Sequence, residues 1–135
     1  MFWTQTNLEA VTFTEGVENL SCIRLTAKGL LRWYASCCNT PIGNTPSNIT
    51  TSFVGLIHNC LSSDHNSLDR SFGLARMHVN VESAIGADKP KSAGVLSGTL
   101  CVIFMMLKAR IDGSYKQTPF FVVESGAPTS CPKSA

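Results

Sequence analysis

The sequence carries little charge of either sign. Asp, Glu, Lys and Arg make up 15% of its 135 residues, against roughly 25% in an average soluble domain. The formal net charge of +2 provides no basic patch of the kind that nucleic-acid binding requires, so we expect no nucleic-acid partner. The hydrophobic fraction of 44% excludes a disordered chain. The length is that of one domain, which we predict to span 1–135.

Signals for export are also missing. The N-terminal stretch MFWTQTNLEAV has no positively charged region followed by an apolar run, so it does not read as a secretory signal. Without such a signal, a chain with six cysteines is not expected to use them as a disulfide framework. We therefore expect a cytoplasmic protein whose thiols are reduced.

Several catalytic and metal-binding motifs are absent from the sequence. It has no CxxC or CxC pair for a structural zinc site, no Gly-rich phosphate-binding loop and no paired-carboxylate signature. What it does have is the adjacent pair Cys37 and Cys38, in the stretch WYASCCNTPIGNTP over 33–46. Neighbouring residues of a strand point to opposite faces, so two adjacent cysteines seldom bind one ion together.

A sparse cluster of metal ligands can still be drawn from the sequence. His58 and Cys60 fall on the same face of a predicted strand, so the candidate ligands are Cys38 (or Cys37), His58 and Cys60. The alternative is that three of the six cysteines are small buried hydrophobic residues, as free cysteines usually are. The cysteines in question are Cys22, Cys60 and Cys101.

Alternating apolar residues predict a β-rich chain. Within 18–26, the pattern places Leu20 and Cys22 on one strand face. The stretch that follows the two adjacent cysteines, 39–50, is rich in Pro, Gly and Asn and predicts a loop. The predicted strands are 10–15, 18–26, 30–36, 51–60, 74–83 and 119–124.

One helix is predicted late in the chain, over 93–110. The stretch 93–107 contains no charged residue, but it is shorter than the roughly 20 residues that a membrane-spanning helix needs. A helix packed on the sheet is the favoured interpretation, and a helix lying on a membrane surface through 93–107 is the alternative. We expect a stop at Asp112-Gly113 and a mobile tail over 125–135. The fold class is therefore α+β, β-rich, with one late apolar helix.

The stretch 23–45, IRLTAKGLLRWYASCCNTPIGNT, resembles the C-terminal part of the glutathione-dependent formaldehyde-activating enzyme family, which includes centromere protein V. Further similarity runs through FVGLIH, a Lys-Pro-Lys segment and DGSYKQTPFF. The resemblance implies a partial β-tent-like sheet and zinc held by cysteines. It also implies carbon–sulfur lyase activity on a glutathione adduct.

The family's last cysteine element, Arg-x-Phe-Cys-x-x-Cys-Gly-Thr-x-Leu, maps onto residues 32–42. Cys38 matches its second cysteine and Ala35 stands in place of the first, while Cys37 is an additional thiol. Asn39 replaces the glycine, which is compatible with a left-handed backbone conformation.

Nothing upstream matches the family's other cysteine elements, CxCG and CxCxxC. We therefore predict a non-catalytic member with a degenerate zinc site, in which this chain alone binds Zn²⁺ weakly or not at all. The alternative is a zinc-binding carbon–sulfur lyase. A sheet that lacks its N-terminal part would have an unpaired edge, and this favours a homodimer.

Overall fold

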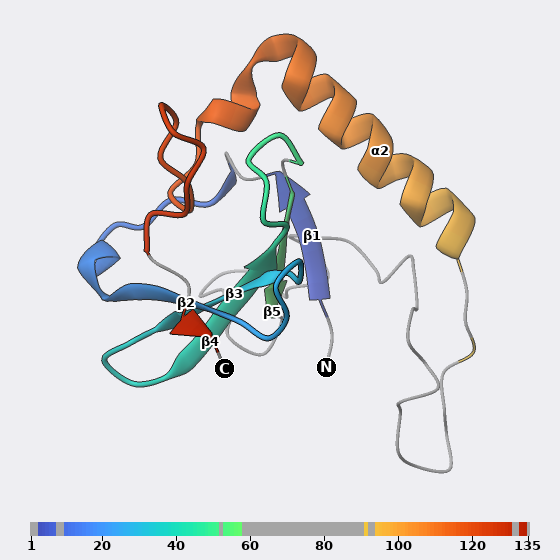
Figure 1. The fold of residues 1–135 in the computed structure, drawn as a ribbon. Coiled ribbons are helices and arrows are strands. Elements are labelled where there is room, and N and C mark those ends of the chain that lie inside the picture. Colours follow the sequence, from blue (N-terminus) through green and yellow to red (C-terminus); the bar gives the residue numbers. More distant parts are fainter. Residues whose placement is uncertain are drawn as a thin grey trace.

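The computed structural model describes residues 3–7, 10–51, 53–57, 91, 94–130 and 133–134. It contains a sheet built mainly of antiparallel strands and one long helix (Figure 1), which confirms the α+β, β-rich prediction. The elements are β1 (Trp3–Asn7), η2 (Val17–Asn19), β2 (Leu20–Arg24), β3 (Leu31–Ala35), β4 (Thr40–Thr45), β5 (Phe53–Ile57), α2 (Val95–Asp112), η5 (Ser114–Lys116) and β6 (Lys133–Ser134).

The strands follow the order β1-β5-β4-β3-β2-β6 in one sheet. All neighbours pair antiparallel except β2 and β6, which pair in parallel. The two residues of β6 belong to the stretch predicted as a mobile tail, 125–135, and they lie opposite Ile23 and Arg24. The mobility of that tail stays a prediction.

The core lies against β2 and β3. Leu20 and Cys22 are both buried, which confirms the face predicted for this strand, and Leu31 and Trp33 of β3 are buried beside them. The Trp33 indole Nε1–H donates a hydrogen bond to Thr45 Oγ1 at 2.9 Å, so the polar atom of this buried ring has a partner.

Residues 40–45 were predicted as part of a loop, and this prediction is wrong, because they form the central strand β4. This strand pairs with β3 on one side and with β5 on the other. Pro41 is tolerated because the β3–β4 register shifts between Trp33 and Tyr34, and proline within a sheet is found at such irregularities. Gly43 lets the neighbouring strand approach, since a Cβ there would lie 2.8 Å from the Gly55 carbonyl oxygen.

Two other predicted strands are also wrong. Neither 10–15 nor 119–124 forms a strand, apart from an isolated bridge between Phe121 and Pro128. Their phenylalanine side chains pack over the sheet instead, with the rings of Phe13 and Phe120 in edge-to-face contact at 5.8 Å. The predicted strand 74–83 lies outside the described residues.

The late helix is confirmed as α2, although its ends differ slightly from the predicted 93–110. It begins after Gly94 and ends before Gly113, both of which have left-handed backbone conformations. The stop at Asp112-Gly113 is thus where it was predicted. The Ser114 N–H donates to Asp112 Oδ1 at 2.9 Å, and this bond lowers the pKa of the carboxyl. Among the described helices, none combines the length and the apolar character needed to cross a membrane.

Candidate functional site

Cys37 and Cys38 lie in the tight turn that joins β3 to β4, over residues 36–39. The turn is closed by the Cys38 N–H, which donates to the Ala35 carbonyl at 3.3 Å. Asn39 ends it with a φ of 56°, a left-handed conformation with which this residue was expected to be compatible. Asparagine is one of the few residues other than glycine that adopt this conformation readily.

A second contact fixes the turn against the start of β2. The Ser36 N–H and hydroxyl both donate to the Asn19 carbonyl, at 2.8 and 3.1 Å. Asn19 directly precedes β2, so the turn is held by its own hydrogen bond and also by hydrogen bonds to the chain that enters the neighbouring strand. The backbone that carries the two thiols is therefore well anchored.

The turn brings the two sulfur atoms together and leaves both exposed. Cys37 Sγ and Cys38 Sγ are 3.7 Å apart, and both residues are exposed. The rule that adjacent cysteines point apart holds in a strand, but here they occupy a turn. With Zn–S bonds of about 2.3 Å, two sulfurs of a tetrahedral zinc site lie about 3.8 Å apart. The two thiols are thus separated by about the distance expected for two sulfur ligands of the same zinc ion.

The two thiols differ in acidity. Cys38 Sγ lies 3.0 Å from Thr40 Oγ1, and hydrogen bonds from the Thr40 hydroxyl and backbone lower the pKa of Cys38. Its bond to Cys38 raises the pKa of Cys37. Because a thiolate is both the nucleophile and the metal ligand, Cys38 is the more reactive member of the pair.

The described part of the chain does not include the remaining candidate ligands. Across the residues that the structure describes, no group of three or more His, Cys, Asp or Glu side chains is placed to hold a metal ion. His58 and Cys60 lie outside the described residues. Strands β4 and β5 run antiparallel. The last residue of β5, Ile57, therefore lies at the end of the sheet where β4 begins.

The other described cysteines lie elsewhere. Cys22 is fully buried, and its thiol donates to the Ser130 carbonyl at 3.3 Å. It is a core residue, as predicted. The prediction that Cys101 is also buried is wrong, since this residue is exposed on α2.

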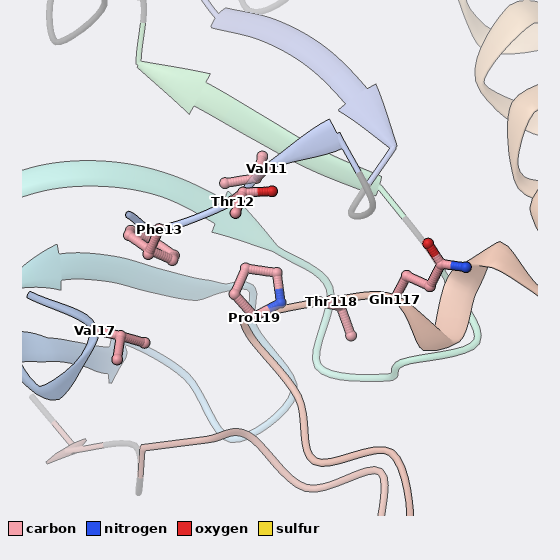
Figure 2. A pocket seen from close by; sticks show the side chains of 7 residues that line it. All are labelled: Val11, Thr12, Phe13, Val17, Gln117, Thr118 and Pro119. Atoms are coloured by element: carbon pink, nitrogen blue, oxygen red, sulfur yellow. The ribbon is translucent and has the colours of Figure 1, made fainter. Parts of the chain in front are cut away.

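The turn borders one hollow of the surface. A depression of about 200 Å³ has Cys37 on its wall, together with Phe13, Leu20 and Ile42. Sequence reasoning missed it because Phe13 comes from a segment predicted to be a strand. A larger hollow of about 350 Å³, shown in Figure 2, lies between the segments before β2 and after α2. Its described lining, Val11, Thr12, Phe13, Val17, Gln117, Thr118 and Pro119, includes no ionisable side chain.

The chain matches the model of a family of unknown function (DUF6151) over residues 2–121. It belongs to this family. The matched region of this DUF6151 chain includes the turn 36–39, the strands β1 to β5 and α2. No curated protein and no solved structure shows significant similarity to the chain.

The acidity of Cys38 gives a first testable prediction. A Thr40→Val variant removes the hydroxyl beside Cys38 Sγ, and this should raise the pKa of the thiol. Since one such hydrogen bond is worth about 0.5–1.5 kcal/mol, alkylation of Cys38 at neutral pH should slow by roughly two- to tenfold. Iodoacetamide labelling, followed by peptide mass spectrometry over a range of pH, measures the rate at each cysteine.

The same experiment compares the two neighbours directly. In the unmodified protein the labelling rate of Cys38 should rise at lower pH than that of Cys37, because the two pKa values are displaced in opposite directions. Thr12→Val, at an exposed threonine, is the matched control and should leave the Cys38 rate unchanged. Identical pH profiles for the two thiols would contradict the geometry of the turn.

Proposed function

We propose that this protein is a non-catalytic, β-rich member of the glutathione-dependent formaldehyde-activating family with a degenerate zinc site. The observation that carries the proposal is the 3.7 Å separation of Cys37 Sγ and Cys38 Sγ. These sulfurs lie in the segment that resembles the family's last cysteine element, and they have the spacing of two zinc ligands. The pair is then what the described residues supply of a four-ligand site.

Two thiolates fit zinc chemically but fall short of a complete site. A structural zinc ion takes four protein ligands, and a catalytic one takes three plus an exchangeable water. With two sulfurs, half of the coordination positions are left to water, so any ion is held weakly. A weakly held ion cannot be kept in position to polarise a glutathione adduct, which is the reason for proposing that the protein is not an enzyme.

The proposal also includes a cytoplasmic location. Exposed neighbouring thiols such as Cys37 and Cys38 persist in the reduced form where glutathione and thioredoxin systems operate. Reduction keeps Cys38 available as a thiolate, which is the form that binds a metal ion.

A homodimer is part of the same proposal, for the reason given from the sequence, that an unpaired sheet edge favours association.

Zinc content measured on the full chain tests this function. Protein purified without chelator should contain well under one zinc per chain after dialysis. Added zinc should bind weakly, and Cys38→Ser should weaken that binding more than Cys37→Ser because Cys38 is the more acidic thiol. Cys101→Ser, at an exposed thiol on α2, is the matched control and should bind zinc as the unmodified chain does.

Two further variants decide whether the described residues supply the whole set of ligands. His58→Ala and Cys60→Ser should leave zinc affinity unchanged if the turn alone provides the ligands. One tightly held zinc per chain, lost in either of these variants, would contradict the degenerate site. That outcome would favour the alternative, a zinc-binding carbon–sulfur lyase, and turnover of a glutathione–formaldehyde adduct would then be the next measurement.

A further inference from the structure

One face of α2 presents large apolar side chains to solvent. The exposed fractions reach 87% for Ile111, 77% for Leu96 and 71% for Phe104. Their spacing along the helix, at i, i+4, i+7, i+8, i+11 and i+15, places them on a single stripe about 100° wide. We call this set the α2 stripe, and it consists of Leu96, Leu100, Ile103, Phe104, Leu107 and Ile111.

The opposite face of the helix is also apolar and faces the protein. Ala109 is buried, and Val102, Met105 and Met106 are half-buried. Figure 1 shows α2, in orange, with its N-terminal end standing clear of the strands. A surface helix normally has one apolar face, which is covered by protein, and a polar face opposite it. In α2 both faces are apolar, and the α2 stripe is not covered by the described residues. An exposed apolar patch of this kind marks an interaction surface.

The charges around the α2 stripe indicate what would cover it. At 100° per residue, Lys108 and Arg110 fall on opposite borders of the stripe, and both are exposed. Lys91, also exposed, precedes the helix. The sequence from 91 to 111 contains no acidic residue. The surface is thus an apolar stripe with a cationic border.

A second copy of the chain complements this surface poorly. If two α2 helices paired through their stripes in antiparallel orientation, Lys108 and Arg110 of one copy would lie near the first turns of the other. Those turns contain no acidic side chain. In parallel orientation the same cations would face one another and repel. An anionic bilayer, in contrast, offers an apolar interior to the stripe and headgroup phosphates to the cations.

We propose that the α2 stripe docks on the surface of an anionic lipid bilayer, with the helix lying in the plane of the interface. The Leu, Ile and Phe side chains would enter the boundary between headgroups and acyl chains, while Lys108 and Arg110 extend to the headgroups. This inference does not depend on the zinc proposal, because it rests on α2 and not on the thiols.

Flotation of the full chain with vesicles tests the inference. One vesicle population contains phosphatidylcholine alone, and the other contains equal parts of phosphatidylcholine and phosphatidylserine. The unmodified protein should float with the second population and much less with the first. Phe104→Glu should lower the partition coefficient by roughly ten- to a hundredfold, the effect of removing one fully buried large apolar side chain.

Variants of the cations separate electrostatic attraction from simple hydrophobic adhesion. Lys108→Gln and Arg110→Gln should each lower partitioning into the anionic vesicles by roughly fivefold, with no effect on phosphatidylcholine alone. The matched control is Val123→Glu, because Val123 is also an exposed apolar residue, at 45%, but lies outside the helix. This control should float like the unmodified chain. Circular dichroism and thermal unfolding confirm that each variant remains folded.

Three results would overturn the proposal. Failure of the folded chain to float with either population is the first. Equal flotation of the Phe104→Glu variant and the unmodified chain is the second. The third is a lipid-free dimer that dissociates in Phe104→Glu but persists in Val123→Glu, since a second copy of the chain would then occupy the α2 stripe.

Discussion

Replacement of Trp33 by alanine is expected to lower the free energy of unfolding by about 3–5 kcal/mol. Trp33 is 1% exposed and is one of the largest side chains of the core. Its ring packs against those of Phe120 and Phe121, with centroids 5.1 and 6.3 Å away. The variant would therefore leave a cavity between the sheet and the segment that covers it, and would also remove the hydrogen bond to Thr45.

Urea unfolding followed by circular dichroism measures this effect. Trp33→Phe is an informative companion variant, because it retains an aromatic ring but removes the indole N–H that Thr45 Oγ1 accepts from. Its loss should be smaller than that of the alanine variant and should include the cost of a buried hydroxyl without its donor, about 1–3 kcal/mol. A loss below 1 kcal/mol for Trp33→Ala would show that the ring is not central to the core.

Replacement of Phe120 by alanine is expected to cost a similar amount, about 3–5 kcal/mol. Phe120 is fully buried, and its ring contacts Trp33 on β3 and Phe13 on the segment before β2. The Thr129 N–H donates to the Phe120 carbonyl at 2.9 Å. The residue thus attaches the chain that follows α2 to the sheet.

The same urea experiment tests this prediction, with Val122→Ala as the matched control. Val122 lies two residues along and is 41% exposed, so its variant should change stability by less than about 0.5 kcal/mol. In a double-mutant cycle, Trp33→Ala and Phe120→Ala should couple by about 0.5–1.5 kcal/mol, the usual value for an aromatic pair. Strict additivity would contradict the observed ring contact.

The elements predicted best from the sequence are strands that bury only one of their two faces, and a helix that ends at a glycine. Strands β2 and β3 show the period-2 alternation of a strand with one face in the core, and α2 ends at the glycine that was expected to stop it. Strand β4 was missed because Pro41, Gly43 and Asn44 have low strand propensity. Its conformation is determined instead by the strands that pair on both of its sides, which is information that local patterns do not contain.

The segment after the helix was missed for a different reason. The run PFFVVE over 119–124 has the composition of a strand, but Phe120 and Phe121 are buried by packing across the sheet while Val122 and Val123 are exposed. A short apolar run can form a strand or an irregular segment that packs on a sheet. The sequence pattern alone does not distinguish these two structures.

The candidate site could be predicted in part. Asn39 replaces a glycine of the family element and was expected to be compatible with a left-handed conformation, which it adopts. The approach of Cys37 and Cys38 was not foreseen, since the separation of two adjacent side chains depends on whether the backbone there is a strand or a turn. Neither could the difference in acidity be foreseen, because it depends on the position of Thr40 beside one sulfur.

The number of sulfur atoms that surround a bound zinc ion tests most directly whether the zinc site is degenerate. Zinc-edge X-ray absorption identifies the coordinating atoms. It is measured on the full chain loaded with less than one zinc ion per chain. We expect two sulfurs at about 2.3 Å, with oxygen or nitrogen atoms in the other positions. This signal should be lost in a Cys37→Ser, Cys38→Ser double variant. A shell of three or four sulfurs would contradict the degenerate site.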